Sequence, residues 1–213
     1  MFIKAGHLLT LDKSIGDIEQ GEILIEGNRI KDVGKNLNSG QTSQETGTIE
    51  AKEMIVMPGF VNAHMHTWQT GIRGVAGDWL LSDYMGHMHA NLATQFAAED
   101  LYLANLVGAL NQLNCGVTAL FDWCHNNPTP EHTDRAIDGL EESGIRALFA
   151  HGTPKPDVEI DGIPHSQVPH PAEEIKRLAT GRLSSRDALV TLGMAIRGPD
   201  ISTWEITEHD VAL

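Results

Sequence analysis

The stretch "PGFVNAHMHTWQTGIR", Pro58–Arg73, decides how this chain of 213 residues is interpreted. It places two histidines one residue apart, His64 and His66, at the end of an apolar run. Residues i and i+2 of a β-strand point to the same face of a sheet, so we expect both imidazoles to project together. Two imidazoles at this spacing can hold one divalent metal ion, but two histidines satisfied by hydrogen bonds near a surface loop would show the same pattern.

Beyond the histidine pair, helical and strand patterns alternate along the chain. The helical pattern predicts helices, and short β-rich runs between them predict strands. The predicted helices cover Ala97–Gly116, Thr129–Gly144 and His170–Gly181, and the predicted strands Val117–Trp123, Ile145–His151 and Arg186–Pro199. Alternation of this kind is typical of a parallel sheet or barrel.

The segment before the histidine pair has a different character. Residues 1–53 contain short β-rich runs, a hairpin turn at Gly27–Asn28 and a polar loop at Asn36–Gly47. We expect a β-sandwich segment there. The run "MIVMPGFVNAH", Met54–His64, is interpreted as a buried strand leading into a loop, so the second domain is expected to cover residues 54–213.

Three runs of residues resemble one known family. They are "MPGFVNAHMH" from Met57, "RGVAGDWLLSDYM" from Arg73 and "EDLYLANLVGALNQLNCGVTALFDW" from Glu99. Together they resemble the amidohydrolase superfamily, specifically its cytosine deaminase-like and chlorohydrolase-like branch, and the likeness covers essentially the whole chain. The resemblance implies an α/β fold in which residues 54–213 form the N-terminal half of a (β/α)8 TIM-type barrel.

The resemblance also implies a chemistry. In the family a pair such as His64 and His66 binds one divalent metal, zinc in first place with iron as the alternative. A metal-bound hydroxide then attacks a nitrogen heterocycle and releases ammonia, so the intact protein would hydrolyse carbon–nitrogen bonds other than peptide bonds. Dechlorination and cyclic amide hydrolysis remain open, because the same hydroxide step serves them.

Four further side chains are candidates for binding a substrate. Gln69 can donate and accept hydrogen bonds at a heterocycle edge, or it can face solvent. Trp68 can stack on a flat ring, or it can pack a loop. His151 and Arg197 end two predicted strands, where barrel active sites lie.

Two local patterns refine these expectations. A second pair, His87 and His89, falls in a predicted helical stretch, where residues i and i+2 do not share a face, so it is not expected to bind a metal. The stretch "HANLATQF" from His89 contains no acid, whereas nucleoside-deaminating relatives tend to place a glutamate there. This difference favours a free base or another heterocycle over a nucleoside.

The composition limits the classes of partner. The net charge is −14, from 15 Lys and Arg against 29 Asp and Glu, so a nucleic acid would be repelled. Two cysteines without a CxxC spacing, and the lack of a signal peptide or a long apolar run, predict a cytoplasmic protein without a membrane partner. We expect a small heterocyclic substrate and a homo-oligomer.

The last residues predict a helix that has only begun. Thr207 stands at an expected N-cap position, and Asp210 stands three residues later, at the capping-box position. Asp210 is less than one helical turn before Leu213. The family's catalytic residues and remaining metal ligands are expected beyond Leu213, so a metal would be held weakly by this chain alone. The rival hypothesis is a non-catalytic fragment or pseudoenzyme that acts as a binding module.

Overall fold

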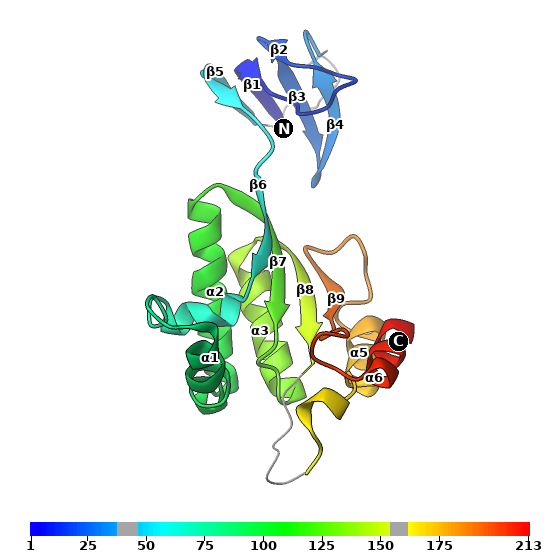
Figure 1. Ribbon diagram of the computed structural model, residues 1–213. Helices are drawn as coiled ribbons and strands as arrows, with labels where there is room; N and C mark the ends of the chain where they lie inside the picture. Colours follow the sequence, from blue (N-terminus) through cyan, green and yellow to red (C-terminus); the bar gives the residue numbers. More distant parts are fainter. Residues whose placement is uncertain (38–46, 154–161) are drawn as a thin grey trace. The chain divides into compact units, whose positions relative to one another are not determined.

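A computed structural model describes residues 1–37, 47–153 and 162–213 (Figure 1). The chain divides into two compact units, Met1–Gly59 and Phe60–Leu213. Most of the predicted polar loop Asn36–Gly47 lies outside the described residues, as do residues 154–161, in a stretch after His151 whose prolines predict a long loop. Within the described residues, no helix is long and apolar enough to cross a bilayer.

The first unit is a five-stranded sheet. Its strands are β1 (Phe2–Leu8), β2 (Ile18–Glu19), β3 (Glu22–Glu26), β4 (Arg29–Gly34) and β5 (Thr48–Val56). The strands β2, β1, β3 and β4 lie side by side in antiparallel pairs, and β5 pairs with β1 in parallel. The predicted hairpin turn is confirmed, because Gly27 takes a φ of 60° between β3 and β4. Ala5, Leu8 and Ile23 form the buried core of this sheet.

One predicted strand is wrong in its extent. Met54–Val56 does not lead into the histidines but ends β5, where Ile55 pairs with His7. Met54 and Ile55 are also exposed rather than buried, at 63% and 66%. The strand that carries His64, β6, begins only at Phe60, since Pro58 has no backbone N–H to donate to a ladder.

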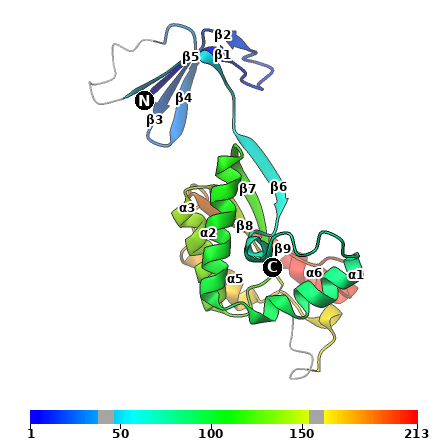
Figure 2. The same cartoon turned by 90° about the vertical axis from the view of Figure 1, so that its left-hand side faces the viewer.

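The second unit is a four-stranded sheet in which every neighbouring pair is parallel (Figures 1 and 2). Its strands, in both chain and spatial order, are β6 (Phe60–Met65), β7 (Val117–Cys124), β8 (Arg146–Gly152) and β9 (Val190–Ala195). The connecting helices are α2 (Ala98–Asn114), α3 (Pro130–Ser143) and α5 (Ala172–Thr180). The alternation of strands and helices predicted from the sequence is therefore confirmed.

Local signals explain where these helices begin and end. Thr129 caps α3 by accepting the N–H of His132, Pro130 follows at the first helical position, and Gly144 ends the helix with a φ of 77°. Such a cap contributes about 1 kcal/mol. The apolar faces of the helices meet the sheet in one core that contains Leu101, Ile137, Leu140, Ile145, Phe149 and Leu178.

The last helix, α6 (Trp204–Ala212), begins earlier than predicted. Its N-cap is Thr203, which accepts the N–H of Ile206, and Thr207 lies inside the helix with its hydroxyl donating to the Thr203 carbonyl at 3.1 Å. The prediction of Thr207 as the cap is therefore wrong. Asp210 is 3% exposed and accepts the backbone N–H of His170 at 2.8 Å, so it ties α6 to the segment before α5.

The helices α2 and α3 pack against each other, side by side in Figure 2. Gly139 of α3 allows this close approach, because a Cβ there would lie 2.5 Å from the carbonyl oxygen of Tyr102 and 2.9 Å from the amide nitrogen of Leu106. Both are backbone atoms that cannot rotate away.

We expect Gly139→Ala to lower the free energy of unfolding by about 1–3 kcal/mol, because overpacking outweighs the gain in helix propensity. Gly86→Ala is the matched control, since a Cβ at Gly86 would meet nothing within 4 Å. Urea denaturation of both variants measures the difference. Equal stability of the two variants would contradict the close packing of α2 on α3.

Candidate active site at the carboxyl ends of the strands

A cavity of about 320 Å³ lies at the carboxyl ends of the parallel strands. His66 follows β6, Trp123 and His125 come from the end of β7, and Arg197 follows β9. The full lining consists of His66, Tyr84, Met85, His89, Trp123, His125, Thr153, His165, Ala195, Arg197 and Ile201. This edge of a parallel α/β sheet is where such proteins place their active sites.

The histidine pair lies at the carboxyl end of β6, and His66 lines the cavity. The rings of His64 and His66 lie 5.0 Å apart between centroids, and His64 is exposed while His66 is half-buried. Nδ1 of His66 lies 2.8 Å from the carbonyl oxygen of Trp123. A carbonyl only accepts, so Nδ1 carries the proton, and the lone pair of neutral His66 is on Nε2.

This hydrogen bond is the arrangement that metal-binding histidines generally show, with one ring nitrogen donating to a protein carbonyl and the other binding the metal. Burial lowers the pKa of His66, with a smaller contribution from His64, although the bond to Trp123 opposes the shift. A neutral ring is the form that binds a metal.

A buried carboxyl group holds the turn after the pair. Asp122 is fully buried at the end of β7, and its Oδ1 accepts the backbone N–H of Thr67 at 2.9 Å. Its Oδ2 lies 3.4 Å from the amide nitrogen of Asn105. Burial raises the pKa of Asp122 to about 6, because hydrogen bonding to Thr67 only partly compensates for the lost solvation.

Trp68 does not have the position expected from the sequence. Its ring is fully buried and stands edge-on to Phe96 at 5.3 Å. The indole Nε1 donates to Nδ1 of His125 at 3.1 Å. Nδ1 of His125 therefore carries no proton, and the proton of the neutral ring lies on Nε2. Trp68 thus contacts a cavity residue, His125, and its ring is not exposed to the cavity; stacking of Trp68 on a substrate stays a prediction.

Of the other three candidates, the structure places one at the cavity wall. Arg197 lines the cavity and donates to the carbonyl oxygen of His165, and its contact with a substrate stays a prediction. Gln69 donates to the Tyr84 hydroxyl at 2.5 Å, so it supports a wall residue. His151 is fully buried and is bound to other buried side chains, so the expectation that it contacts a substrate is not supported.

Sequence reasoning missed the contribution of a short π-helix, η3 (Tyr84–His89). His87 and His89 point apart, as expected: His87 packs on Trp79 at 5.3 Å, while His89 packs on His125 at 4.5 Å. A π-turn shifts the spacing of side chains by one residue, which a helical period does not predict. The pair of histidines in "GHMHA", residues 86–90, was one signal that this segment could reach the site.

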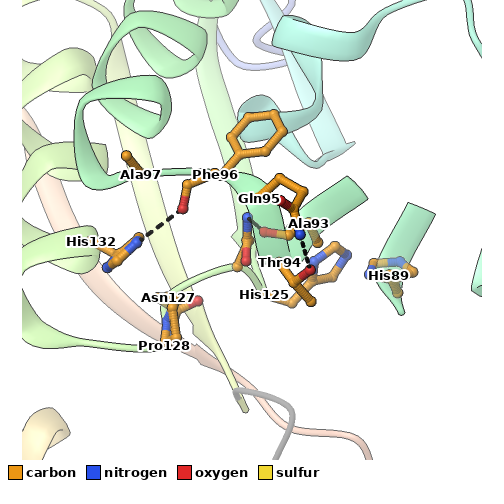
Figure 3. A pocket seen from close by; sticks show the side chains of 11 residues that line it. His89, Ala93, Thr94, Gln95, Phe96, Ala97, His125, Asn127, Pro128 and His132 are labelled. Carbon is orange, nitrogen blue, oxygen red and sulfur yellow. Dashed lines mark hydrogen bonds between the residues drawn. The ribbon is translucent and has the colours of Figure 1, made fainter. Parts of the chain in front are cut away.

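A second cavity, of about 550 Å³, shares His89 and His125 with the first (Figure 3). Its wall includes Asn127 and also His132, which bonds to the carbonyl oxygen of Phe96 at 3.2 Å. The side chains of His89 and His125 thus stand between two cavities.

The metal-binding capacity of these residues is limited. Across residues 1–37, 47–153 and 162–213, no group of three or more His, Cys, Asp or Glu side chains is placed to hold a metal ion. His64 and His66 fit a metal ion as two imidazole ligands. The hydrogen bond from Nδ1 of His66 to the Trp123 carbonyl leaves Nε2 of His66 free to bind the ion. They supply two ligands of the three that a catalytic zinc site usually takes from a protein.

The raised pKa of Asp122 predicts a pH dependence of stability. Between pH 4 and pH 6 the folded protein binds a proton at Asp122 that the unfolded chain has released, so the free energy of unfolding falls as the pH rises. The difference between wild type and Asp122→Asn should fall by about 2 kcal/mol over this range. Urea denaturation of both proteins at several pH values measures this difference. Subtracting the free energy of unfolding of the variant from that of the wild type removes the contribution of the histidines, which both proteins share. A difference that does not change with pH would contradict the burial of this carboxyl group.

Comparisons with known proteins find similarity to two named deaminases. No protein-family model matches the sequence. A 5'-deoxyadenosine deaminase of Methanosarcina barkeri is 33% identical over 154 residues, which are 71% of this chain and 33% of that protein. A 5-methylthioadenosine/S-adenosylhomocysteine deaminase of Caldicellulosiruptor saccharolyticus is 30% identical over 153 residues, which are 71% of this chain and 34% of that protein.

Two solved structures share the fold. Atrazine chlorohydrolase of Arthrobacter aurescens TC1, solved with zinc, has a TM-score of 0.71 at 20% identity and matches 96% of this chain and 48% of its own. An adenosine deaminase of Xanthomonas campestris with bound zinc has a TM-score of 0.72 at 21% identity and matches 94% of this chain and 43% of its own. The aligned part is about a third of each curated relative and less than half of each solved chain. These likenesses show a fold related to the TIM barrel.

Proposed function

Because this chain belongs to the amidohydrolase superfamily, we propose that it contributes a metal site and a substrate cavity to a metal-dependent aminohydrolase of nitrogen heterocycles. The observation that carries the proposal is the bond from Nδ1 of His66 to the Trp123 carbonyl, beside a cavity of about 320 Å³. It presents Nε2 of His66, together with His64, as a pair of ligand atoms at the carboxyl edge of the sheet.

The four parallel strands are proposed to be the first half of a (β/α)8 barrel, and residues 1–53 to be part of a β-sandwich. Two observations support the assignment of the four strands to half a barrel. The strands β6 to β9 lie side by side in chain order with a helix between each pair, which is the barrel pattern. The likeness to the chlorohydrolase covers nearly all of this chain but less than half of that protein.

His64 and His66 would hold one divalent ion, zinc in first place and iron as the alternative. The bound ion supplies a Lewis acid that activates water at neutral pH. The chain's own residues orient the site: Trp123 holds the ring of His66, and Asp122 holds the turn that follows through the N–H of Thr67.

The cavity wall suits a flat and partly polar ligand. Tyr84 and Trp123 supply aromatic surface, Met85 and Ile201 supply apolar contacts, and Arg197 supplies a positive charge. The lack of an acid in "HANLATQF" favoured a free base, yet the curated relatives are named for adenosine derivatives. An adenosine-type nucleoside is therefore the first substrate to test.

A second candidate function follows from the small number of metal-binding side chains at the site. Because the described residues hold no group of three or more metal-binding side chains, a non-catalytic fragment or pseudoenzyme is the alternative. Dechlorination or cyclic amide hydrolysis is the alternative chemistry within the enzyme class. Homo-oligomer formation stays a prediction.

Metal affinity tests the pair directly. We expect the purified chain to bind zinc weakly and reversibly, and His64→Ala or His66→Ala to weaken binding at least about tenfold, because each removes one of two ligands. His87→Ala is the control, since His87 packs on Trp79 instead. Isothermal titration measures the affinities. One zinc per chain that survives dialysis against a chelator would contradict a site of two ligands.

Activity tests the reaction class. The complete reading frame that contains these 213 residues, expressed with zinc, should release ammonia from adenosine-type nucleosides or from free nitrogen heterocycles. His66→Ala should lower this rate at least about 100-fold, while His87→Ala should retain it. An ammonia assay over nucleosides, free bases and triazines measures both. Chloride release from a chlorotriazine without ammonia from any compound would favour dechlorination, and no reaction at all would favour the non-catalytic alternative.

A further inference from the structure

A chain of buried hydrogen bonds runs between the two cavities. It begins at Asn127, which lines the larger cavity, passes through His151 and His170, and ends at Thr153, which lines the smaller one. All four side chains are at most 5% exposed. Neither the metal pair nor the other contacts of the proposed active site need this chain, so its buried polar groups call for an explanation.

The direction of the chain is set at Asn127. Its Nδ2 lies 3.0 Å from the carbonyl oxygen of Gly152 and 2.6 Å from Nε2 of His151. The carbonyl only accepts, so the nitrogen and not the oxygen of the amide occupies this position, and the opposite orientation would place two acceptors against each other. Nε2 of His151 therefore accepts a hydrogen bond from Asn127.

Each later bond follows from the one before it. With Nε2 accepting, neutral His151 carries its proton on Nδ1 and donates to Nε2 of His170 at 3.2 Å. His170 in turn carries its proton on Nδ1 and donates to Oγ1 of Thr153 at 2.9 Å. The Thr153 oxygen is thus an acceptor toward His170, and its own proton must point elsewhere.

Burial keeps both rings neutral, as this direction requires. It lowers the pKa of His151 to about 3, with smaller contributions from His170 and Arg177. It lowers the pKa of His170 to about 4, where Asp210 opposes the shift and Arg197 adds to it. Asp210 also accepts the backbone N–H of His170, which holds this residue in register with α6.

We propose that Thr153 is a ligand-binding residue of the smaller cavity, and that its hydroxyl is directed to donate to an acceptor atom of the ligand by the chain Asn127–His151–His170. The proposal rests on the proposed function and specifies its substrate class: a heterocycle or its product with a carbonyl oxygen or unprotonated ring nitrogen facing Thr153. Asn127, His151 and His170 are positioning residues. Bonds that donate in one direction polarise one another, which strengthens the final donor.

Nitrogen-15 NMR of the histidine rings in the full chain tests the direction. Wild-type His151 and His170 should both carry the proton on Nδ1. Asn127→Asp replaces the donor with an acceptor, so both rings should change to the Nε2–H form. The spectrum of the wild type tests the proposal even if this variant does not fold, because an Nε2–H form of either ring in the wild type would overturn it. This outcome does not depend on whether the protein binds metal or releases ammonia.

Binding tests the donor itself. Adenosine and inosine are titrated calorimetrically into the wild type and into Thr153→Val, a variant that removes the hydroxyl and keeps nearly the same shape. The dissociation constant of inosine should be about tenfold higher for Thr153→Val than for the wild type. Thr153→Ser, which keeps the hydroxyl, should bind within about twofold of wild type. Unchanged affinity in Thr153→Val, or no binding of either nucleoside to the wild type, would overturn the assignment of Thr153 as a ligand donor.

Discussion

The hydrogen bond from Nδ1 of His66 to the carbonyl oxygen of Trp123 is the interaction on which the proposed site depends. It exists because β6 and β7 pair in parallel, which brings the ends of both strands to the same edge. The bond selects one tautomer of His66 and orients its Nε2. Without it the ring could turn about its side-chain bonds, and the spacing to His64 alone would not define a pair of ligands.

Other buried polar groups of the same unit hold side chains and turns near the carboxyl ends of the strands. Asp122 holds the turn after His66, Trp68 fixes the tautomer of His125, and Asn127 fixes that of His151. Each of these side chains is buried, so an unpaired donor or acceptor among them would cost about 1–3 kcal/mol. The stability of the second unit and the orientation of its histidines therefore depend on the same hydrogen bonds.

The sequence predicts the framework of this unit well because its signals are local. The period of α2, the cap at Thr129 and the glycine at Gly144 each act within a few residues, and the helices appear where they are expected. The cap of α6 shows the limit of such signals: Thr203 and Thr207 stand one turn apart, both can cap a helix, and the structure has Thr203 at the cap.

The site itself is predicted only in part. His64 and His66 are found from their spacing, but the contacts that set their roles join residues far apart in the chain, such as Thr67 with Asp122 and His151 with His170. No periodicity predicts these pairs. Trp68 and His151 have the residue types of substrate contacts, and the sequence does not predict that both side chains are fully buried.

The central claim is that His64 and His66 form one half of a metal site, with His66 binding through Nε2. Crystals of the chain soaked in zinc, with anomalous diffraction recorded at the zinc edge, test it most directly. The account predicts one strong peak bonded to both rings, with Nδ1 of His66 still donating to the Trp123 carbonyl. A peak elsewhere, or zinc bound to Nδ1 of His66, would contradict it.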